Sequence, residues 1–190
     1  MTHVMLDLET LSTRANARII AIGAVAFDQD KGVYAKFYQP IVAGASGPLW
    51  DGFTAHMQTH ADEEGFHISK DTLRWWDEQS DEAKRVFTDP NACMMNTALD
   101  AFDCWLGDLD DRTNIRVWGN GASFDNTILA TAYSIMLEDL PWRFYNDRCY
   151  RTAKNLYPNV ALDRIGVYHN AMDDAETQAM HLLKMPVVLN

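Results

Sequence analysis

Three stretches near the start of the chain have the residue patterns of β-strands. His3–Glu9 has the pattern of a short strand, and Ile19–Phe27 is an apolar run rich in β-branched side chains. Val33–Gln39 alternates again after the turn-forming residues 28–32. We expect these strands to form an antiparallel meander.

The rest of the chain mixes helical patterns with short apolar runs. The first expected helix begins with a cap at Ser69 or Asp71 and runs through Leu73 and Trp76 to Val86. The second follows Pro90 and covers Cys93–Leu106, and the third begins at Ser123 and runs through Ile128 and Leu129 to Ile135. The last two are expected near Asp147–Leu156 and over Met172–Lys184, where Pro186 ends the helix. Short strands are expected at Ile115–Trp118 and near Trp142–Tyr145, and residues 40–68 look irregular. This order predicts an α/β fold, a mixed β-sheet flanked by helices.

Length and composition indicate a single soluble domain over residues 1–190. Hydrophobic residues at 47% and charged residues at 23% are ordinary for a globular protein. The sequence shows neither a membrane-spanning run nor a signal peptide, so we expect a cytoplasmic protein without a membrane partner. The three cysteines are expected to be buried reduced thiols. The oligomeric state stays open, and a homodimer is compatible with the sequence.

The net charge of −11 narrows the kinds of nucleic-acid binding that the chain can support. Proteins that hold long stretches of nucleic acid are usually basic, which argues against an extended duplex binder. Metal ions can supply positive charge locally, so an enzyme that holds a few nucleotides at a strand end stays compatible with this composition.

Candidate chemistry begins at the end of the first expected strand. Asp7 and Glu9 alternate with Leu8, so both carboxylates project from one face. Two carboxylates that converge repel each other unless a cation lies between them, and hard oxygen ligands suit Mg²⁺ or Mn²⁺. The pair alone is weak support for a metal site, because the same spacing is common on solvated strands.

Two further patterns each precede a helix. Asp125 follows Asn120 and Phe124 in the first turn of a helix, where it could simply complement the helix dipole. His169 precedes Asp173 and Asp174, and a histidine is the natural general base at neutral pH. Alone, His169 could equally be a surface or capping residue.

In this order the three patterns resemble the three motifs of the DEDDh exonucleases, the group with the polymerase proofreading subunits, oligoribonucleases and ribonuclease T. The resemblance covers nearly the whole chain and implies an RNase H-like fold. Within the family the last aspartate stands five residues after the histidine and before an alanine, which selects Asp174 over Asp173. Asp173 would then face solvent or assist the start of the helix.

Two longer stretches, Asp7–Thr13 with Ile19–Val25 and Thr72–Ser80, resemble a phage and prophage branch of exodeoxyribonuclease A-like and exonuclease VIII-like proteins. That branch also includes bacterial 3′–5′ exoribonucleases, so it does not decide between DNA and RNA. At least one of Trp75 and Trp76 is expected to pack in the core.

The resemblance implies a role for each matching residue. Asp7, Glu9 and Asp174 would bind the first of two Mg²⁺ or Mn²⁺ ions, Asp7 would bridge to the second, and Asp125 would hold the second mainly through water. His169 would act as general base, and nucleoside 5′-monophosphates would leave from the 3′ end of a single strand.

The substrate contacts implied by the resemblance lie on both sides of these residues. Thr10 and Leu11 would contact the terminal nucleotide, with Leu11 wedged against its base, and Asn120 and Phe124 would line the same pocket.

Single-stranded DNA is the expected substrate. RNA trimming like that of oligoribonuclease, and an inactive binding module on the same scaffold, are the alternatives. His56 and His60 have the spacing of a zinc helix but lack its glutamate, so we expect no zinc there.

Overall fold

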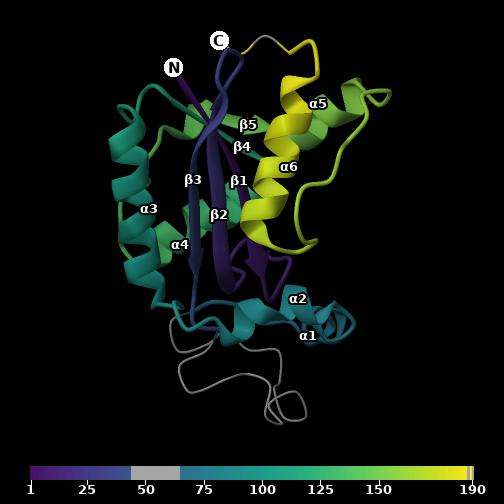
Figure 1. The fold of residues 1–190 in the computed structure, drawn as a ribbon. Coiled ribbons are helices and arrows are strands. Elements are labelled where there is room, and N and C mark those ends of the chain that lie inside the picture. Colours follow the sequence, from purple (N-terminus) through teal and green to yellow (C-terminus); the bar gives the residue numbers. More distant parts are fainter. Residues whose placement is uncertain (44–64, 188, 190) are drawn as a thin grey trace.

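The computed structural model describes residues 1–43, 65–187 and 189. Its five-stranded sheet has the order β3-β2-β1-β4-β5 (Figure 1). The strands are β1 (Thr2–Thr10), β2 (Ile19–Asp28), β3 (Gly32–Pro40), β4 (Ile115–Gly119) and β5 (Asp147–Cys149). The first three strands pair antiparallel, while β4 runs parallel to β1 and β5 parallel to β4. This arrangement confirms the predicted meander and mixed sheet.

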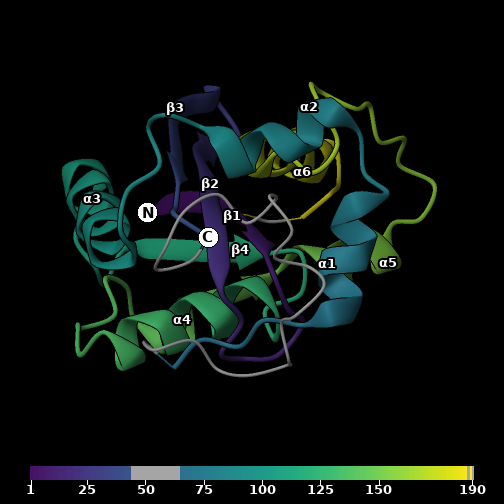
Figure 2. The ribbon, with the colours of Figure 1, turned by 90° about the horizontal axis from the view of Figure 1, so that it is seen from below.

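Helices cover both faces of the sheet. The α-helices are α1 (Lys70–Asp77), α2 (Asp81–Lys84), α3 (Met95–Leu109), α4 (Asp125–Ile135), α5 (Tyr150–Leu156) and α6 (Ala171–Leu183). In Figure 1 α3 lies on one side of the sheet and α6 on the other, and Figure 2 shows α4 and α6 on opposite sides of the strands. The predicted α/β architecture is therefore confirmed.

The alternation along β1 divides its side chains between two cores. Val4, Leu6 and Leu8 pack in the cluster that contains the buried residues of α3 and α4. Met5 packs instead in the cluster with the buried residues of α5 and α6. Because alternate residues share a face, Asp7 and Glu9 lie on the α6 side, as the sequence predicts.

Two predicted elements are wrong in their bounds. The single helix expected up to Val86 is broken after Asp77, since the Ser80 side chain accepts a hydrogen bond from the Ala83 N–H and caps a new helix. The strand expected near Trp142–Tyr145 is displaced, because a 3₁₀ turn, η3 (Phe144–Asn146), comes first and β5 follows it.

Three other expectations have different outcomes. The cysteines are free, as expected, but Cys104 is exposed and the other two are half-buried, so the expected burial is wrong. In the described part of the chain, no helix is both long and apolar enough to cross a membrane. The pair His56 and His60 lies outside the described residues.

Candidate active site

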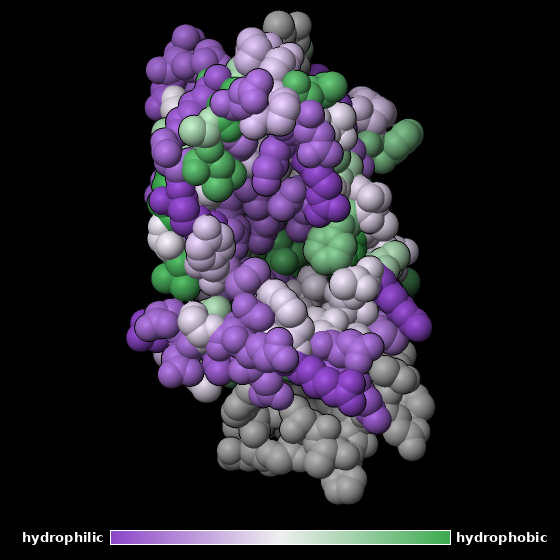
Figure 3. All heavy atoms as spheres, turned by 90° about the vertical axis from the view of Figure 1, so that its right-hand side faces the viewer, coloured by the Kyte–Doolittle hydropathy of each residue, from purple (hydrophilic) through white to green (hydrophobic). Residues whose placement is uncertain are grey.

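A cavity of about 610 Å³ opens between the end of β1, the start of α1, the β4–α4 turn and the start of α6. Its lining residues are Asp7, Leu8, Glu9, Thr10, Ser12, Thr13, Ser69, Asp71, Thr72, Trp75, Asn120, Phe124, Asp125, Arg151, His169, Asp174 and Gln178. Figure 3 shows the right-hand side of the molecule in Figure 1. Hydrophilic residues dominate this side, and hydrophobic residues form small separate groups on it.

A glycine lets α6 approach the strand beside Asp7. Asp7 pairs with Gly23 of β2, and a Cβ at Gly23 would overlap the backbone of Ala171 and Met172 at the start of α6. Without a side chain at this position, the first turns of α6 lie directly on the sheet. This close approach brings the side chains of α6 over the carboxylate of Asp7.

A second glycine has the same effect for α4. At Gly119, the last residue of β4, a Cβ would overlap the side chain of Asn126 and lie 3.0 Å from the Cβ of Asp125. Asp125 is 2% exposed, and its Oδ1 accepts a hydrogen bond of 3.3 Å from the Leu8 N–H. The parallel pairing of β1 and β4 therefore places Asp125 next to Asp7 and Glu9.

The segment before α6 presents His169 in an uncommon backbone conformation. His169 has φ of 62°, in the left-handed region that non-glycine residues rarely adopt. Its backbone N–H donates to Oδ2 of Asp174 at 2.9 Å, and the Asn170 side chain caps the helix by accepting from the Asp173 N–H. Such strain persists where surrounding contacts impose it, and it gathers at functional sites.

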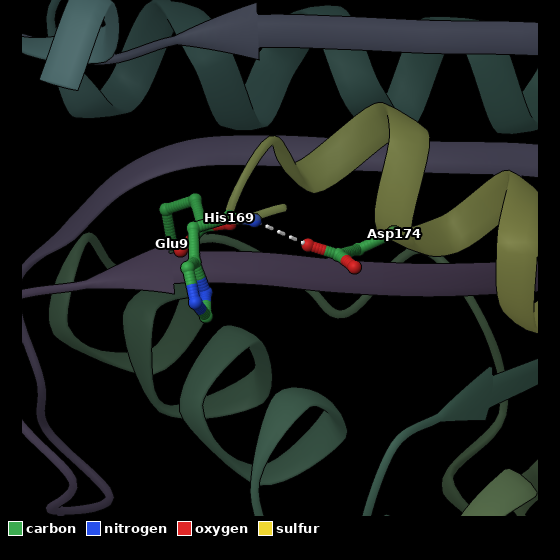
Figure 4. Close-up of side chains that lie close together, drawn as sticks. All are labelled: Glu9, His169 and Asp174. Atoms are coloured by element: carbon green, nitrogen blue, oxygen red, sulfur yellow. Dashed lines mark hydrogen bonds between the residues drawn. The ribbon is translucent and has the colours of Figure 1, made fainter. Parts of the chain in front are cut away.

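Glu9, His169 and Asp174 form the tightest group in the cavity. One ligand atom of each lies within 4.8 Å of the others (Figure 4). Asp7 and Asp125 line the cavity beside this group. The five residues that the sequence singles out therefore come together from three separate parts of the chain.

Burial and mutual repulsion make these carboxylates hard to ionise together. Burial, joined by the charges of Asp125, Glu9 and Asp174, raises the pKa of Asp7 well above its usual range. Burial and then Asp174 raise the pKa of Glu9 in the same way. Burial also raises the pKa of Asp125 to about 7, although hydrogen bonds from backbone N–H groups oppose it. A cation in the cavity would remove this repulsion.

His169 and Asp174 carry additional constraints. Burial lowers the pKa of His169, and the Asp174 carboxylate opposes that shift. Arg164 pairs with Asp174, donates to the Val167 carbonyl and lies 4.2 Å from the centre of the Tyr168 ring. The Arg164 guanidinium therefore links the segment before α6 to Asp174 on the helix itself.

The residues present fit a divalent cation. The carboxylate oxygen Oδ2 of Asp125 is buried without a hydrogen-bond partner, which is costly for a polar atom unless another ligand satisfies it. Clustered carboxylate oxygens suit Mg²⁺ or Mn²⁺. Asp7, Glu9, Asp125 and Asp174 offer the oxygen ligands for such an ion.

Of the predicted substrate contacts, Thr10, Asn120 and Phe124 line the cavity. Leu11 does not, because its side chain is fully buried in the cluster that contains Trp76. The wedge role of Leu11 stays a prediction, for a side chain that lies outside the cavity lining in this structure.

The structure also shows which residue of two adjacent pairs, Asp173 with Asp174 and Trp75 with Trp76, lines the cavity. Asp173 turns from the cavity and accepts a hydrogen bond from the Val167 N–H, whereas Asp174 lines the cavity. Trp76 is fully buried, as expected of one of the two tryptophans, while Trp75 is 39% exposed and lines the cavity.

Besides the place of Trp75 in the lining, sequence reasoning missed three residues of the site. Gln178 donates to Asp7 Oδ1 at 2.7 Å, Arg164 pairs with Asp174, and Arg151 lines the cavity. Gln178 stands four residues after Asp174, so helical spacing could have found it. No local pattern marks the two arginines.

Comparisons with known proteins identify a family for the chain. The family model described as 3′-5′ exoribonuclease Rv2179c-like domain matches residues 2–185. No curated protein is significantly similar to the chain.

Solved structures share the fold. The nuclease domain of 3′hExo, a DEDDh family member bound to rAMP, has a TM-score of 0.58 at 13% identity, over 96% of this chain and 90% of that one. E. coli exonuclease I in complex with a dT13 oligonucleotide has a TM-score of 0.55 at 14% identity, over 96% of this chain and 40% of that one. Cell-death related nuclease 4 has a TM-score of 0.54 at 15% identity, over 96% and 62%. These similarities confirm an RNase H-like fold.

Proposed function

This chain belongs to the Rv2179c-like 3′–5′ exoribonuclease domain family, and we propose that it is a metal-dependent 3′–5′ exonuclease of the DEDDh type. It would hydrolyse single-stranded nucleic acid from the 3′ end and release nucleoside 5′-monophosphates. Residues 1–190 would act as one exonuclease domain in the cytoplasm.

One observation carries the proposal. Four carboxylates and one histidine from distant parts of the sequence converge on a single cavity. Their pKa shifts and the unpartnered oxygen of Asp125 are what a cation site without its cation would have. An inactive binding module would not need several buried carboxylates close together, because their mutual repulsion destabilises the fold.

The carboxylates of Asp7, Glu9, Asp125 and Asp174 would hold two divalent ions. When bound, such ions stabilise the charge that develops on a phosphate during hydrolysis. The Leu8 N–H keeps Asp125 in place, and the Gln178 amide holds Asp7.

His169 is proposed as the general base. Its lowered pKa leaves the imidazole neutral at neutral pH, so it can accept a proton from the attacking water. Hydrolysis then breaks the bond between the phosphorus and the upstream 3′ oxygen. The hydrogen bond from the His169 N–H to Asp174 ties the position of the base to the carboxylate cluster.

The exposed ring of Trp75 is proposed as a stacking surface for a nucleobase. It packs edge-on against His169, with 4.7 Å between ring centres, and Phe124 also lines the cavity. Stacking on aromatic side chains tolerates every base, which suits an enzyme that removes successive nucleotides.

RNA is the first candidate substrate, because the matching family model is described as an exoribonuclease domain. The side chains of Thr10, Thr13, Ser69 and Thr72 bring hydroxyl groups to the cavity, and these can hydrogen-bond to sugar hydroxyls. Single-stranded DNA is the second candidate, because two stretches of the sequence resemble the phage exodeoxyribonuclease branch.

The test is digestion of 5′-labelled RNA, single-stranded DNA and duplex DNA with Mg²⁺, Mn²⁺ or excess chelator. We expect a ladder that shortens from the 3′ end, mononucleotide products and no activity with chelator. Asp7→Asn should abolish turnover while the protein stays folded. Full activity in chelator, or internal cuts in a circular single strand, would refute the proposal, and binding without hydrolysis would favour an inactive module.

A further inference from the structure

Arg151 carries the one permanent positive charge among the residues that line the cavity in the described part of the chain. The same cavity contains five carboxylates, those of Asp7, Glu9, Asp71, Asp125 and Asp174. With a net charge of −11, the protein offers little general attraction to a nucleic-acid strand. The Arg151 guanidinium therefore attracts a phosphate locally, whereas the net charge of the molecule does not.

The guanidinium has a defined position. It donates a hydrogen bond of 2.6 Å to the Asn120 carbonyl, and a Cβ built on Gly121 would lie 3.3 Å from its Cζ atom. Gly121 has φ of 115°, so its left-handed backbone and missing side chain make room for the arginine. Arg151 is thus held over the β4–α4 turn, beside Asn120 and Phe124.

The same contacts leave most of its hydrogen-bonding capacity open to a ligand. A guanidinium has five N–H donors, and Asn120 accepts from one nitrogen. Arg151 is exposed to solvent, and within the described residues it makes no ion pair within 4.0 Å with any carboxylate. Arginine binds phosphate through two parallel hydrogen bonds, so a phosphate group is the ligand that this geometry suits.

The position of Arg151 also indicates which phosphate it would bind. The scissile phosphate must reach the cluster of Glu9, His169 and Asp174, the three residues whose ligand atoms approach most closely. Arg151 lines the cavity next to Asp125, and its charge opposes the rise in the pKa of Asp125 that burial causes. Within the described residues it makes no ion pair with Glu9 or with Asp174, which pairs with Arg164 instead, so its free donors are available to a phosphate beside the scissile one.

We propose that Arg151, fixed over Gly121 by the Asn120 carbonyl, binds the second phosphate from the 3′ end of the strand, immediately upstream of the scissile one. This inference rests on the proposed exonuclease function and adds a substrate-binding site to it. The site makes the enzyme prefer strands with at least two phosphodiester linkages, and it aligns the scissile bond without touching it.

The test uses oligonucleotides of the sugar type that the enzyme degrades better. One has every phosphate charged, and the other carries a single neutral methylphosphonate at the second linkage from the 3′ end. Initial rates for removal of the first nucleotide give kcat and KM for both substrates. The neutral linkage should lower kcat/KM of the wild-type enzyme roughly 10–100-fold, mainly through KM, the effect of losing hydrogen bonds to a charged group.

Arg151→Gln should process the charged substrate as slowly as the wild type processes the neutral one, and it should no longer distinguish the two. Arg151→Lys should recover part of the preference, because charge remains but the paired donors do not. Lys154→Gln, on the same helix but outside the cavity lining, is the matched control and should behave like the wild type.

Each outcome has a separate meaning. If Arg151→Gln slows both substrates by the same factor, the arginine acts on the scissile phosphate or on the fold, and the proposed site is wrong. If the wild type is indifferent to the neutral linkage, the inference is also wrong. If the wild type degrades no oligonucleotide at all, the proposed exonuclease function fails, which is a different result from either.

Discussion

The side-chain amide of Gln178 donates a hydrogen bond to Oδ1 of Asp7 across 2.7 Å, although 171 positions separate the two residues in the sequence. Gln178 lies on α6 one turn after Asp174, and it is 6% exposed. The hydrogen bond to the ionised form lowers the pKa of Asp7, against burial and the neighbouring carboxylates. Gln178 therefore favours the charged state of Asp7 that a metal ion requires.

Gln178→Leu should weaken metal binding and turnover by about 10–100-fold, the usual effect of removing a partner that orients a ligand. Isothermal titration with Mn²⁺ and single-turnover rates measure the two effects. Glu176→Gln is the control, since Glu176 lies on the same helix but pairs with Lys36 outside the cavity. Wild-type Mn²⁺ affinity in Gln178→Leu would show that the amide has only a packing role.

Asp125 should make the metal-free protein less stable as the pH rises. The folded carboxyl has a pKa of about 7 against a usual value of 3.8. Between these values the folded protein holds a proton that the unfolded chain has released, so stability falls from about pH 4 to about pH 7. Asp125→Asn keeps an oxygen for the Leu8 N–H but cannot ionise, so it should lack this fall and be the more stable form at neutral pH.

The measurement is the melting temperature in chelator at a series of pH values, compared between the wild type and Asp125→Asn. The difference between the two curves reports the ionisation of Asp125 together with its effect on the pKa of Asp7 and Glu9, which its charge raises. Parallel curves across this range would contradict the assignment. Added Mn²⁺ should raise the melting temperature of the wild type more than that of the variant.

His169→Asn should lose roughly 10²–10⁴-fold in single-turnover rate, the usual contribution of a positioned general base. Asparagine tolerates the left-handed backbone that His169 adopts, so the loss would report chemistry more than local strain. Mn²⁺ affinity should fall far less than the rate, because the carboxylates remain.

The wild-type rate should also rise with pH and level off, because only neutral His169 can accept a proton. Burial lowers the pKa of this imidazole, so the rise should lie below its usual value of 6.5. A near-wild-type rate in His169→Asn, or a profile without this rise, would remove the histidine from the mechanism.

The adjacent tryptophans should respond in opposite ways. Trp76 is fully buried and its indole N–H donates to the Thr10 carbonyl at 3.0 Å, so Trp76→Ala should destabilise the fold by about 3–5 kcal/mol. Trp75→Ala should leave the melting temperature nearly unchanged and raise KM for oligonucleotides by roughly 5–100-fold, the effect of losing one stacked base. Thermal melts and steady-state kinetics on both variants check the contrast, and an unchanged KM in Trp75→Ala would reject the stacking role.

The local sequence determines which faces the side chains occupy. The alternation from Val4 to Glu9 predicts that Asp7 and Glu9 leave one side of the strand and Leu8 the other, because a strand repeats every two residues. The position of Asp125 in the first turn of its helix follows from the local pattern in the same way. These local patterns alone leave each residue open to a structural role, and the resemblance to the DEDDh exonucleases is what selects the five candidate residues, including Asp174 over Asp173.

The tertiary structure decides which of these faces meet. The approach of α6 to the sheet at Gly23 puts Gln178 on Asp7, and the turn at Gly121 admits Arg151 to the cavity. Helical spacing puts Gln178 on the same face as Asp174, but the sequence does not show that it meets Asp7 or that Arg151 enters the cavity, because each contact depends on how closely two distant backbones pack. The same packing buries Leu11 and turns Trp75 toward the cavity. Periodicity along the chain thus determines the direction of a side chain, while only long-range packing determines its neighbours.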